Sequence, residues 1–250
     1  MLANMIICEI GHNHLGDENY GYEYINKLIG LNIGAITFQI RESLYYKDAE
    51  KEKFKLKKDF YIKANKIIKN ARKKVGIAIC DENEIDFFEK LNVDFYKVIR
   101  NDINNVSLIT KLLETNKFIY VSTGMSNFED IERFFSRINE SKRKKIILNH
   151  TQLSYDLKDA NLRAISIMKE KYKVPVSFGS HSTCKNILIL SLAFEPCDIL
   201  FYVKGSKIER HPDEKHAISL DNLENFLKDL NELPITLGTG NKIKMDNSIN

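Results

Sequence analysis

The stretch Met5-Ile6-Ile7-Cys8-Glu9-Ile10-Gly11-His12-Asn13-His14-Leu15-Gly16-Asp17 indicates how the whole chain folds. Its apolar beginning is typical of a buried strand. Glu9 appears where that run should end, and the polar turn between Gly11 and Gly16 carries two histidines and an asparagine. Asp17 is of the residue type that caps helices. This order predicts the first βα unit of a barrel enzyme, and the alternative is a surface turn with a structural glutamate.

Seven further short apolar runs follow, at Ala35–Phe38, Gly76–Cys80, Phe95–Ile99, Phe118–Val121, Ile146–Leu148, Val174–Phe178 and Ile199–Val203. Amphipathic segments of helical length accompany them, at Tyr20–Leu31, Phe54–Lys74, Glu82–Leu91, Val106–Glu114, Phe128–Ile138, Leu162–Tyr172, Cys184–Phe194 and Leu220–Leu230. Strands that are apolar throughout indicate a parallel sheet covered on both faces. Eight such alternations in 250 residues predict an α/β fold, the (β/α)8 TIM barrel, as a single domain over residues 1–235 with a polar tail at 236–250.

The composition is that of a globular protein with a sizeable core, with 43% hydrophobic and 29% charged residues. The net charge of +4 comes from lysine-rich helices, so no nucleic-acid partner is expected. The chain has no apolar run of about 18 residues and no signal-peptide pattern, which predicts no membrane span and a cytoplasmic location. Its four cysteines lack metal-finger spacing, so we expect neither disulfides nor a zinc finger.

Polar residues stand at the ends of the expected strands. The loops after barrel strands meet at one end of the barrel, where catalytic residues are placed. All six histidines fall in these loops, namely His12, His14, His150, His181, His211 and His216. A lone histidine is commonly structural, but six at one end predict a site that binds anions or a metal.

Two strand ends suggest anion binding. Ser122, Thr123 and Gly124 precede an expected helix and offer hydroxyls and backbone N–H groups to a phosphate, although an ordinary helix cap explains them equally well. Lys97 ends a strand inside the barrel, where it could hold an anion or form a Schiff base.

Together these segments resemble the N-acetylneuraminate (sialic acid) synthase family. The resemblance rests on motifs spread over nearly the whole chain, Ile7–Gly16, Phe38-Gln39, Asp94–Lys97, Val121–Met125, Asn161–Ile165, Ser180–Ser182, Pro212-Asp213 and Ser219-Leu220. It implies a (β/α)8 transferase of surface-carbohydrate biosynthesis. Such an enzyme condenses phosphoenolpyruvate with an N-acetylmannosamine-type sugar to a nonulosonic acid, and a divalent metal (Mn²⁺ or Mg²⁺) orients the sugar aldehyde.

The resemblance also implies roles for single residues. Glu9 would be the acid or base near the aldehyde or the attacking water, and His181 would bind the metal. Gln39 and Asp213 would hold the sugar, while Lys97 and Ser122 would hold phosphoenolpyruvate. We add Arg100, Thr123, Gln152 and Lys204 as further substrate-binding candidates.

The chain departs from the family pattern at several of these positions. Thr37 replaces a lysine, Ala78 a threonine, Arg100 a serine, Gln152 an asparagine and Gly179 a serine. Phe201-Tyr202-Val203 replaces Glu-Lys-His, which puts Val203 at the place of the second metal histidine and predicts a weak or empty metal site. The family's C-terminal antifreeze-like domain, which gives an arginine to the partner's site, is not expected here, so a homodimer or a partner subunit is considered.

Three hypotheses remain open. The first is a divergent synthase whose anion pocket is rebuilt with Arg100, Lys204 and His150. The second is a non-catalytic relative that binds a sugar or a partner subunit, in which Arg100 pairs with Asp102 or Glu9. The third is a Schiff-base aldolase that uses Lys97 or Lys204. In the first, we expect Glu9, Gln39, Lys97, Ser122 and His181 to line one pocket.

Overall fold

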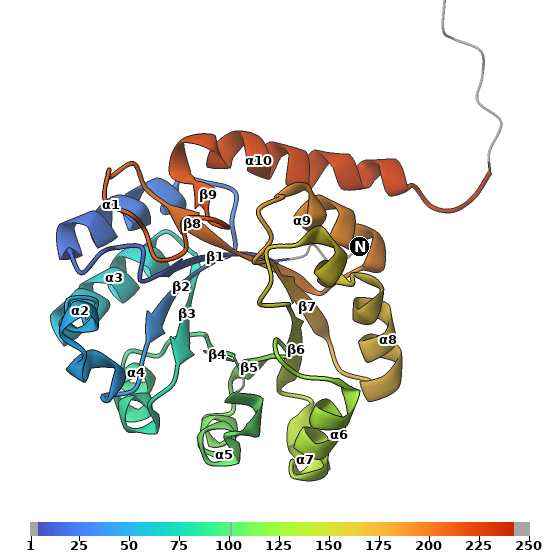
Figure 1. Cartoon of the computed structure of the whole chain (residues 1–250), viewed down its shortest axis with the longest axis horizontal. Coiled ribbons are helices and arrows are strands. Elements are labelled where there is room, and N and C mark those ends of the chain that lie inside the picture. The colour runs from blue at the N-terminus through green and yellow to red at the C-terminus, as the bar shows by residue number, and fades with distance from the viewer. Residues whose placement is uncertain (1–4, 101, 243–250) are drawn as a thin grey trace, which may run out of the picture.

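The computed structural model describes residues 5–100 and 102–242 and shows a closed barrel (Figure 1). The barrel strands are β1 (Met5–Gly11), β2 (Ala35–Ile40), β3 (Lys74–Ile79), β4 (Phe95–Val98), β5 (Phe118–Ser122), β6 (Ile146–His150), β7 (Val176–Gly179) and β8 (Asp198–Lys204). Each strand pairs in parallel with the next, and β8 pairs with β1 to close the ring. The predicted (β/α)8 barrel is therefore confirmed.

Helices surround the barrel between the strands (Figure 1). The α-helices are α1 (Glu18–Ile29), α2 (Ala49–Glu52), α3 (Lys58–Asn70), α4 (Ile85–Lys90), α5 (Val106–Glu114), α6 (Phe128–Ser136), α7 (Glu140–Arg143), α8 (Arg163–Tyr172), α9 (Asn186–Ser191) and α10 (Leu220–Glu232). The shorter elements are the 3₁₀ helices η1 (Tyr45–Lys47), η2 (Glu82–Glu84), η3 (Asp102–Asn104), η4 (Leu157–Ala160), η5 (Leu192–Phe194) and η6 (Leu233–Leu237), and the strand β9 (Ile218–Ser219).

Two local expectations have different outcomes. Asp17 does cap α1, since its side chain accepts hydrogen bonds from the backbone N–H groups of Asn19 and Tyr20. The helix expected at Phe54–Lys74 is present but shorter than predicted, because α3 begins only at Lys58 and ends at Asn70. The preceding segment forms η1 and the short α2, which starts where Asp48 accepts a hydrogen bond from the backbone N–H of Glu50. This segment follows β2, and its Tyr45 lines the cavity described below.

The hydrophobic core has two parts. The larger one lies between the barrel and its helices, and the smaller one fills the barrel interior with Ile7, Ala35, Phe95, Tyr120, Ile147 and Leu200. At the N-terminal end of the barrel, the hydroxyl of Tyr120 donates to Asp198 Oδ2 at 2.6 Å. The packed interior leaves room for a cavity at the opposite end, where the strands finish.

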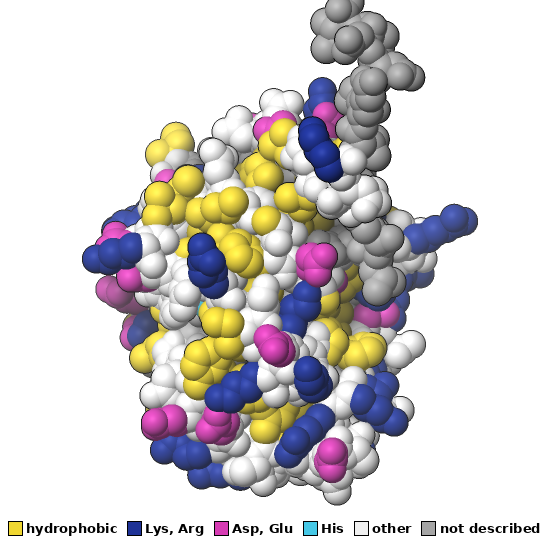
Figure 2. Space-filling view, turned by 90° about the vertical axis from the view of Figure 1, so that its right-hand side faces the viewer, with side chains coloured by type: hydrophobic (Ala, Val, Ile, Leu, Met, Phe, Trp, Pro, Cys, Tyr) yellow, Lys and Arg dark blue, Asp and Glu magenta, His cyan; other side chains and the backbone are white. Residues whose placement is uncertain are grey.

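The outer face of the helical layer is mixed in character. Figure 2 shows hydrophobic side chains interspersed with both acidic and basic ones on the face that carries α8 and α9. None of the helices within the described ranges is long and apolar enough to cross a membrane. The last described element is η6, and residues 243–250 of the expected tail lie outside the described residues.

Candidate active site

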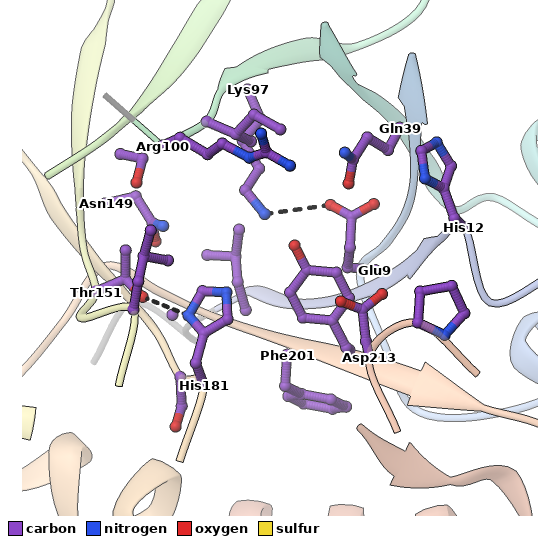
Figure 3. Close-up of a pocket in the computed structure, with 18 of the residues that line it drawn as sticks. Glu9, His12, Gln39, Lys97, Arg100, Asn149, Thr151, His181, Phe201 and Asp213 are labelled. Carbon is purple, nitrogen blue, oxygen red and sulfur yellow. Dashed lines mark hydrogen bonds and ion pairs between the residues drawn. The ribbon is translucent and has the colours of Figure 1, made fainter. Parts of the chain in front are cut away.

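A cavity of about 300 Å³ lies at the C-terminal ends of the barrel strands. Its lining includes Glu9, Gln39, Lys97, Arg100, Ser122, His181 and Asp213, all of them singled out from the sequence. Figure 3 shows that the labelled side chains among them, those of Glu9, Gln39, Lys97, Arg100, His181 and Asp213, converge on one space, as the barrel prediction requires. The structure thus brings these residues together, while their individual roles remain predictions.

A buried ion pair lies at the centre of the cavity wall. Lys97 Nζ on β4 is 3.2 Å from Glu9 Oε2 on β1, and both side chains are almost completely buried. Glu9 Oε1 also accepts a hydrogen bond from the backbone N–H of Gly11 at 3.1 Å. The left-handed backbone of Gly11 (φ +56°) makes this tight turn possible. The carboxylate is therefore held in one orientation, which a proton-transferring group requires.

Arg100 follows β4 and extends toward the same space (Figure 3). Its backbone adopts a left-handed conformation (φ +56°), which is uncommon for a residue with a side chain. Among the described residues, Arg100 has neither an ion-pair nor a hydrogen-bond partner. Its guanidinium is therefore free to bind an anion in the cavity.

Asp213 lies in the loop after β8, on the other side of Glu9 (Figure 3). Burial and the nearby Glu9 carboxylate raise the pKa of Asp213 to about 7. Asn13 holds this loop in place, since its Nδ2 donates to the Val203 carbonyl at 2.8 Å and its Oδ1 accepts from the Asp213 N–H at 3.1 Å. Asp213 can therefore exchange a proton near neutral pH.

The six histidines divide into two groups. His12 and His181 line the cavity, and His216 packs directly behind His181 with 4.7 Å between the ring centroids. The other three stabilise loops. His14 Nδ1 accepts from the backbone N–H of Gly16, His150 Nε2 lies 2.9 Å from the Ala160 carbonyl, and His211 Nε2 lies 2.9 Å from the Tyr20 hydroxyl. The clustering of histidines thus pointed to the correct end of the barrel, but half of them have structural contacts.

The side chains at the end of β8 correct one prediction from the sequence, the one that places Val203 at the position of the second metal ligand. Val203 is fully buried in the core between the barrel and its helices, so it does not face the cavity. The side chain that lines the cavity at this level is Tyr202, one residue earlier, with 5.7 Å between its ring centroid and that of His181. Side chains alternate along a strand, so Leu200 and Tyr202 face inward while Phe201 and Val203 face the helices.

The donor set does not fit the divalent metal that the family resemblance implies. His181 Nδ1 already lies 3.0 Å from the Thr151 hydroxyl. Burial and the Lys97 charge lower the pKa of His181 to about 4, and burial with the neighbouring His181 lowers that of His216 to about 3. Both rings are therefore neutral and could bind a metal, which usually takes three or four protein ligands. The described residues contain no group of three His, Cys, Asp or Glu side chains placed to do so.

Three predicted substrate-binding residues lie outside the cavity lining. Thr123 is buried with its hydroxyl near the Asn149 carbonyl, Gln152 lies beside the loop after β7, and Lys204 forms a 3.1 Å ion pair with Glu214. The α6 N-terminus is capped by Asn127 in a capping box with Asp130, so its first turn offers no simple phosphate site. Ser122 does line the cavity.

Several residues of the cavity wall had no role predicted from the sequence. Tyr45 comes from η1, Asn149 and Thr151 from the end of β6, and Tyr202 from β8. His12 lies between the rings of Tyr45 and Phe54, with centroid distances of 5.5 and 5.2 Å. Side chains alternate between the two faces of β8, and this pattern could have identified Tyr202 as a residue of the cavity wall. The position of Tyr45 depends on the irregular segment between β2 and α3, whose course no sequence pattern predicted.

The chain is similar to known proteins over most of its length. The NeuB family model matches residues 31–242. The chain is 25% identical to the N,N'-diacetyllegionaminic acid synthase of Campylobacter jejuni, over 97% of this chain and 80% of that protein. It is 28% identical to the N-acetylneuraminate-9-phosphate synthase of Drosophila melanogaster, over 70% of this chain and 53% of that protein.

Solved structures agree on the fold. The N-acetylneuraminic acid (sialic acid) synthetase of Leptospira borgpetersenii serovar Hardjo-bovis, in complex with citrate, superposes with a TM-score of 0.86 at 23% identity, over 98% of this chain and 88% of that one. A truncated 3-deoxy-D-arabino-heptulosonate 7-phosphate synthase from Thermotoga maritima gives 0.76 at 14% identity, over 94% and 88% of the two chains. With the family match spanning most of the barrel, the chain belongs to the NeuB family.

Proposed function

We propose that this protein condenses phosphoenolpyruvate with an N-acetylmannosamine-type sugar to form a nonulosonic acid. In this reaction, C3 of phosphoenolpyruvate forms a bond to the aldehyde carbon of the sugar. Water adds at C2 and inorganic phosphate leaves, so that one water is consumed for each phosphate released. We expect this transferase to act in carbohydrate biosynthesis in the cytoplasm, where phosphoenolpyruvate is produced.

The observation that carries the proposal is the unpaired Arg100 beside the buried Lys97. At a pH below about 7, where Asp213 is mostly protonated, Lys97, Arg100 and Glu9 give this part of the cavity one net positive charge. A guanidinium binds phosphate or carboxylate through two parallel hydrogen bonds. Ser122 adds a hydroxyl to the same wall, so we assign this end of the cavity to phosphoenolpyruvate.

The opposite end suits the sugar and the proton transfers. Gln39, Asp213 and His12 line it with amide, carboxyl and imidazole groups. Glu9, held by Lys97 and Gly11, is oriented to take a proton from the attacking water. Asp213 can supply the proton that the former aldehyde oxygen needs.

Two alternatives receive less support. In a non-catalytic relative, Arg100 would pair with Glu9 or Asp102 and occupy the pocket, but Glu9 is paired with Lys97 instead. A Schiff-base aldolase needs an uncharged lysine amine in the cavity. Lys97 is held in an ion pair there, and Lys204 is paired with Glu214 outside the cavity lining.

Calorimetric titration with phosphoenolpyruvate tests the proposal. Arg100→Ala should raise the Kd about 10- to 150-fold, which corresponds to the roughly 1.5–3 kcal/mol of a charged hydrogen bond. Arg72 offers a matched control, because it is another exposed arginine with a left-handed backbone (φ +59°) and precedes β3 at the other end of the barrel. Arg72→Ala should leave the Kd unchanged. If the wild-type protein does not bind phosphoenolpyruvate, the synthase function is wrong.

A further inference from the structure

The hydroxyl of Tyr202 is a hydrogen-bond donor for which the described part of the chain holds no partner. The residue is half-buried and lines the cavity, and its hydroxyl is not among the buried polar atoms that lack a partner. The hydroxyl is therefore accessible from the cavity. By contrast, Tyr120, lower in the barrel interior, donates its hydroxyl to Asp198.

The ring of Tyr202 is fixed by contacts on several sides. Tyr202 is the register partner of Glu9 on the neighbouring strand β1. Its ring packs so closely on Gly11 that a Cβ added there would lie 3.1 Å from Tyr202 Cε1. The His216 ring meets it edge-on with 4.9 Å between centroids, and Lys97 Nζ is 5.5 Å from its centroid. Such packing pre-organises the hydroxyl, because little rotational freedom is left to lose on binding.

The surroundings of this hydroxyl indicate what it binds. Burial and the nearby carboxylates of Asp213 and Glu9 raise the pKa of Tyr202 well above its usual value. The phenol therefore stays protonated and acts as a hydrogen-bond donor toward the cavity, and the Lys97 ammonium, 5.5 Å from its ring centroid, adds a positive charge nearby. An uncharged carbonyl oxygen fits such a donor, and the hydrogen bond strengthens as negative charge develops on that oxygen.

We propose that the Tyr202 hydroxyl donates a hydrogen bond to the carbonyl oxygen of the aldehyde substrate and stabilises the negative charge that forms there during carbon–carbon bond formation. This inference rests on the proposed condensation and deepens it. It assigns to a phenol on β8 the polarisation of the aldehyde, for which the described residues offer no three-ligand metal site. The hydrogen bond itself transfers no proton.

Tyr202→Phe tests the inference because it removes only the hydroxyl and keeps the packed ring. Phosphate release from phosphoenolpyruvate would be measured with N-acetylmannosamine, its 6-phosphate and a 2,4-diacetamido hexose as aldehyde substrates. We expect kcat to fall about 100- to 1,000-fold, as for the loss of one oxyanion donor. The KM for the sugar should change little, and the Kd for phosphoenolpyruvate should not change. Tyr96→Phe removes a hydroxyl that donates to Glu89 away from the cavity lining, and should leave kcat unchanged.

The other outcomes separate the two proposals. If wild-type protein and Tyr202→Phe share the same kcat, or if only KM rises, the hydroxyl binds the sugar passively or not at all and the inference is overturned. The same holds if wild-type protein binds phosphoenolpyruvate but converts none of the three sugars. If wild-type protein does not bind phosphoenolpyruvate, the proposed function is wrong, and the inference that rests on it is wrong as well.

Discussion

Lys97 Nζ and Glu9 Oε2 lie 3.2 Å apart although their strands, β4 and β1, are not neighbours, so this ion pair crosses the barrel interior. Glu9 is 1% exposed and Lys97 5% exposed. Neither charge can be hydrated well if the other is removed. The pair therefore links function and stability at the same two residues.

Removing one partner should destabilise the fold strongly. We expect Lys97→Met or Glu9→Gln to lower the free energy of unfolding by about 3–5 kcal/mol. In each variant, the charge of the remaining partner stays buried without an opposite charge beside it. The double variant should lose much less than the sum of the two. Urea unfolding measures this, with Lys51→Met as control, because the Lys51–Asp48 pair is exposed to solvent and should contribute little to stability. Additive losses in the double variant would contradict the coupling.

The neutral histidines predict a loss of stability in mild acid. Burial is the main cause that lowers the pKa of His12 and His181 to about 4 and that of His14 and His216 to about 3. Below about pH 6.5 these histidines become protonated in the unfolded chain but stay neutral in the folded chain. Each of them therefore lowers the free energy of unfolding by up to about 1.4 kcal/mol for every pH unit that the pH falls. Urea unfolding at pH values from 7 down to 5 should show this decline.

The raised pKa of Asp213 has the opposite effect on how the free energy of unfolding depends on pH. Its folded-state pKa of about 7 exceeds the ordinary value of 3.8, so its contribution is fully present in acid and is lost as the pH rises through about 7. Asp213→Asn should therefore steepen the decline between pH 7 and 5, while His216→Gln should make it shallower. An unfolding free energy that does not depend on pH in this range would show that these groups titrate normally.

The sequence predicted the barrel because its signal is repeated eight times, and a single shifted boundary, as at α3, does not change the fold. It also predicted most of the cavity, because residues such as Glu9, Lys97 and His181 stand at strand ends that a barrel must bring together. It could not show that Glu9 and Lys97 pair, since they are 88 positions apart and the contact depends on side-chain reach across the barrel. At the end of β8, the motif resemblance placed Val203 at the second metal-ligand position. The side chain that faces the cavity is that of Tyr202, one residue earlier, because side chains alternate along a strand.

Because Tyr202 faces the cavity and Val203 does not, the structure leads to a prediction about metal binding. The Tyr202 ring lies next to both His181 and His216, with centroid distances of 5.7 and 4.9 Å. Tyr202→His would place a third imidazole in this group, and transition metals favour three or four such ligands. We expect its affinity for Mn²⁺ or Zn²⁺ to exceed that of the wild-type protein at least tenfold, as measured by calorimetry. Val203→His should give no gain, because that side chain faces the helices. Stoichiometric metal retained by wild-type protein after dialysis would contradict the weak site expected from the sequence.

The last prediction concerns the chemistry of Lys97. A Schiff base forms only from a free amine, whereas Lys97 Nζ is held in an ion pair with the Glu9 carboxylate at 3.2 Å. Borohydride reduction in the presence of pyruvate should therefore leave no adduct on Lys97 detectable by mass spectrometry of the intact protein. Glu9→Gln removes the opposing charge, so it serves as the sensitised variant: a Schiff-base enzyme should be trapped more readily after this change. A stoichiometric adduct on Lys97 of wild-type protein would overturn the anion-holding role and support the aldolase alternative.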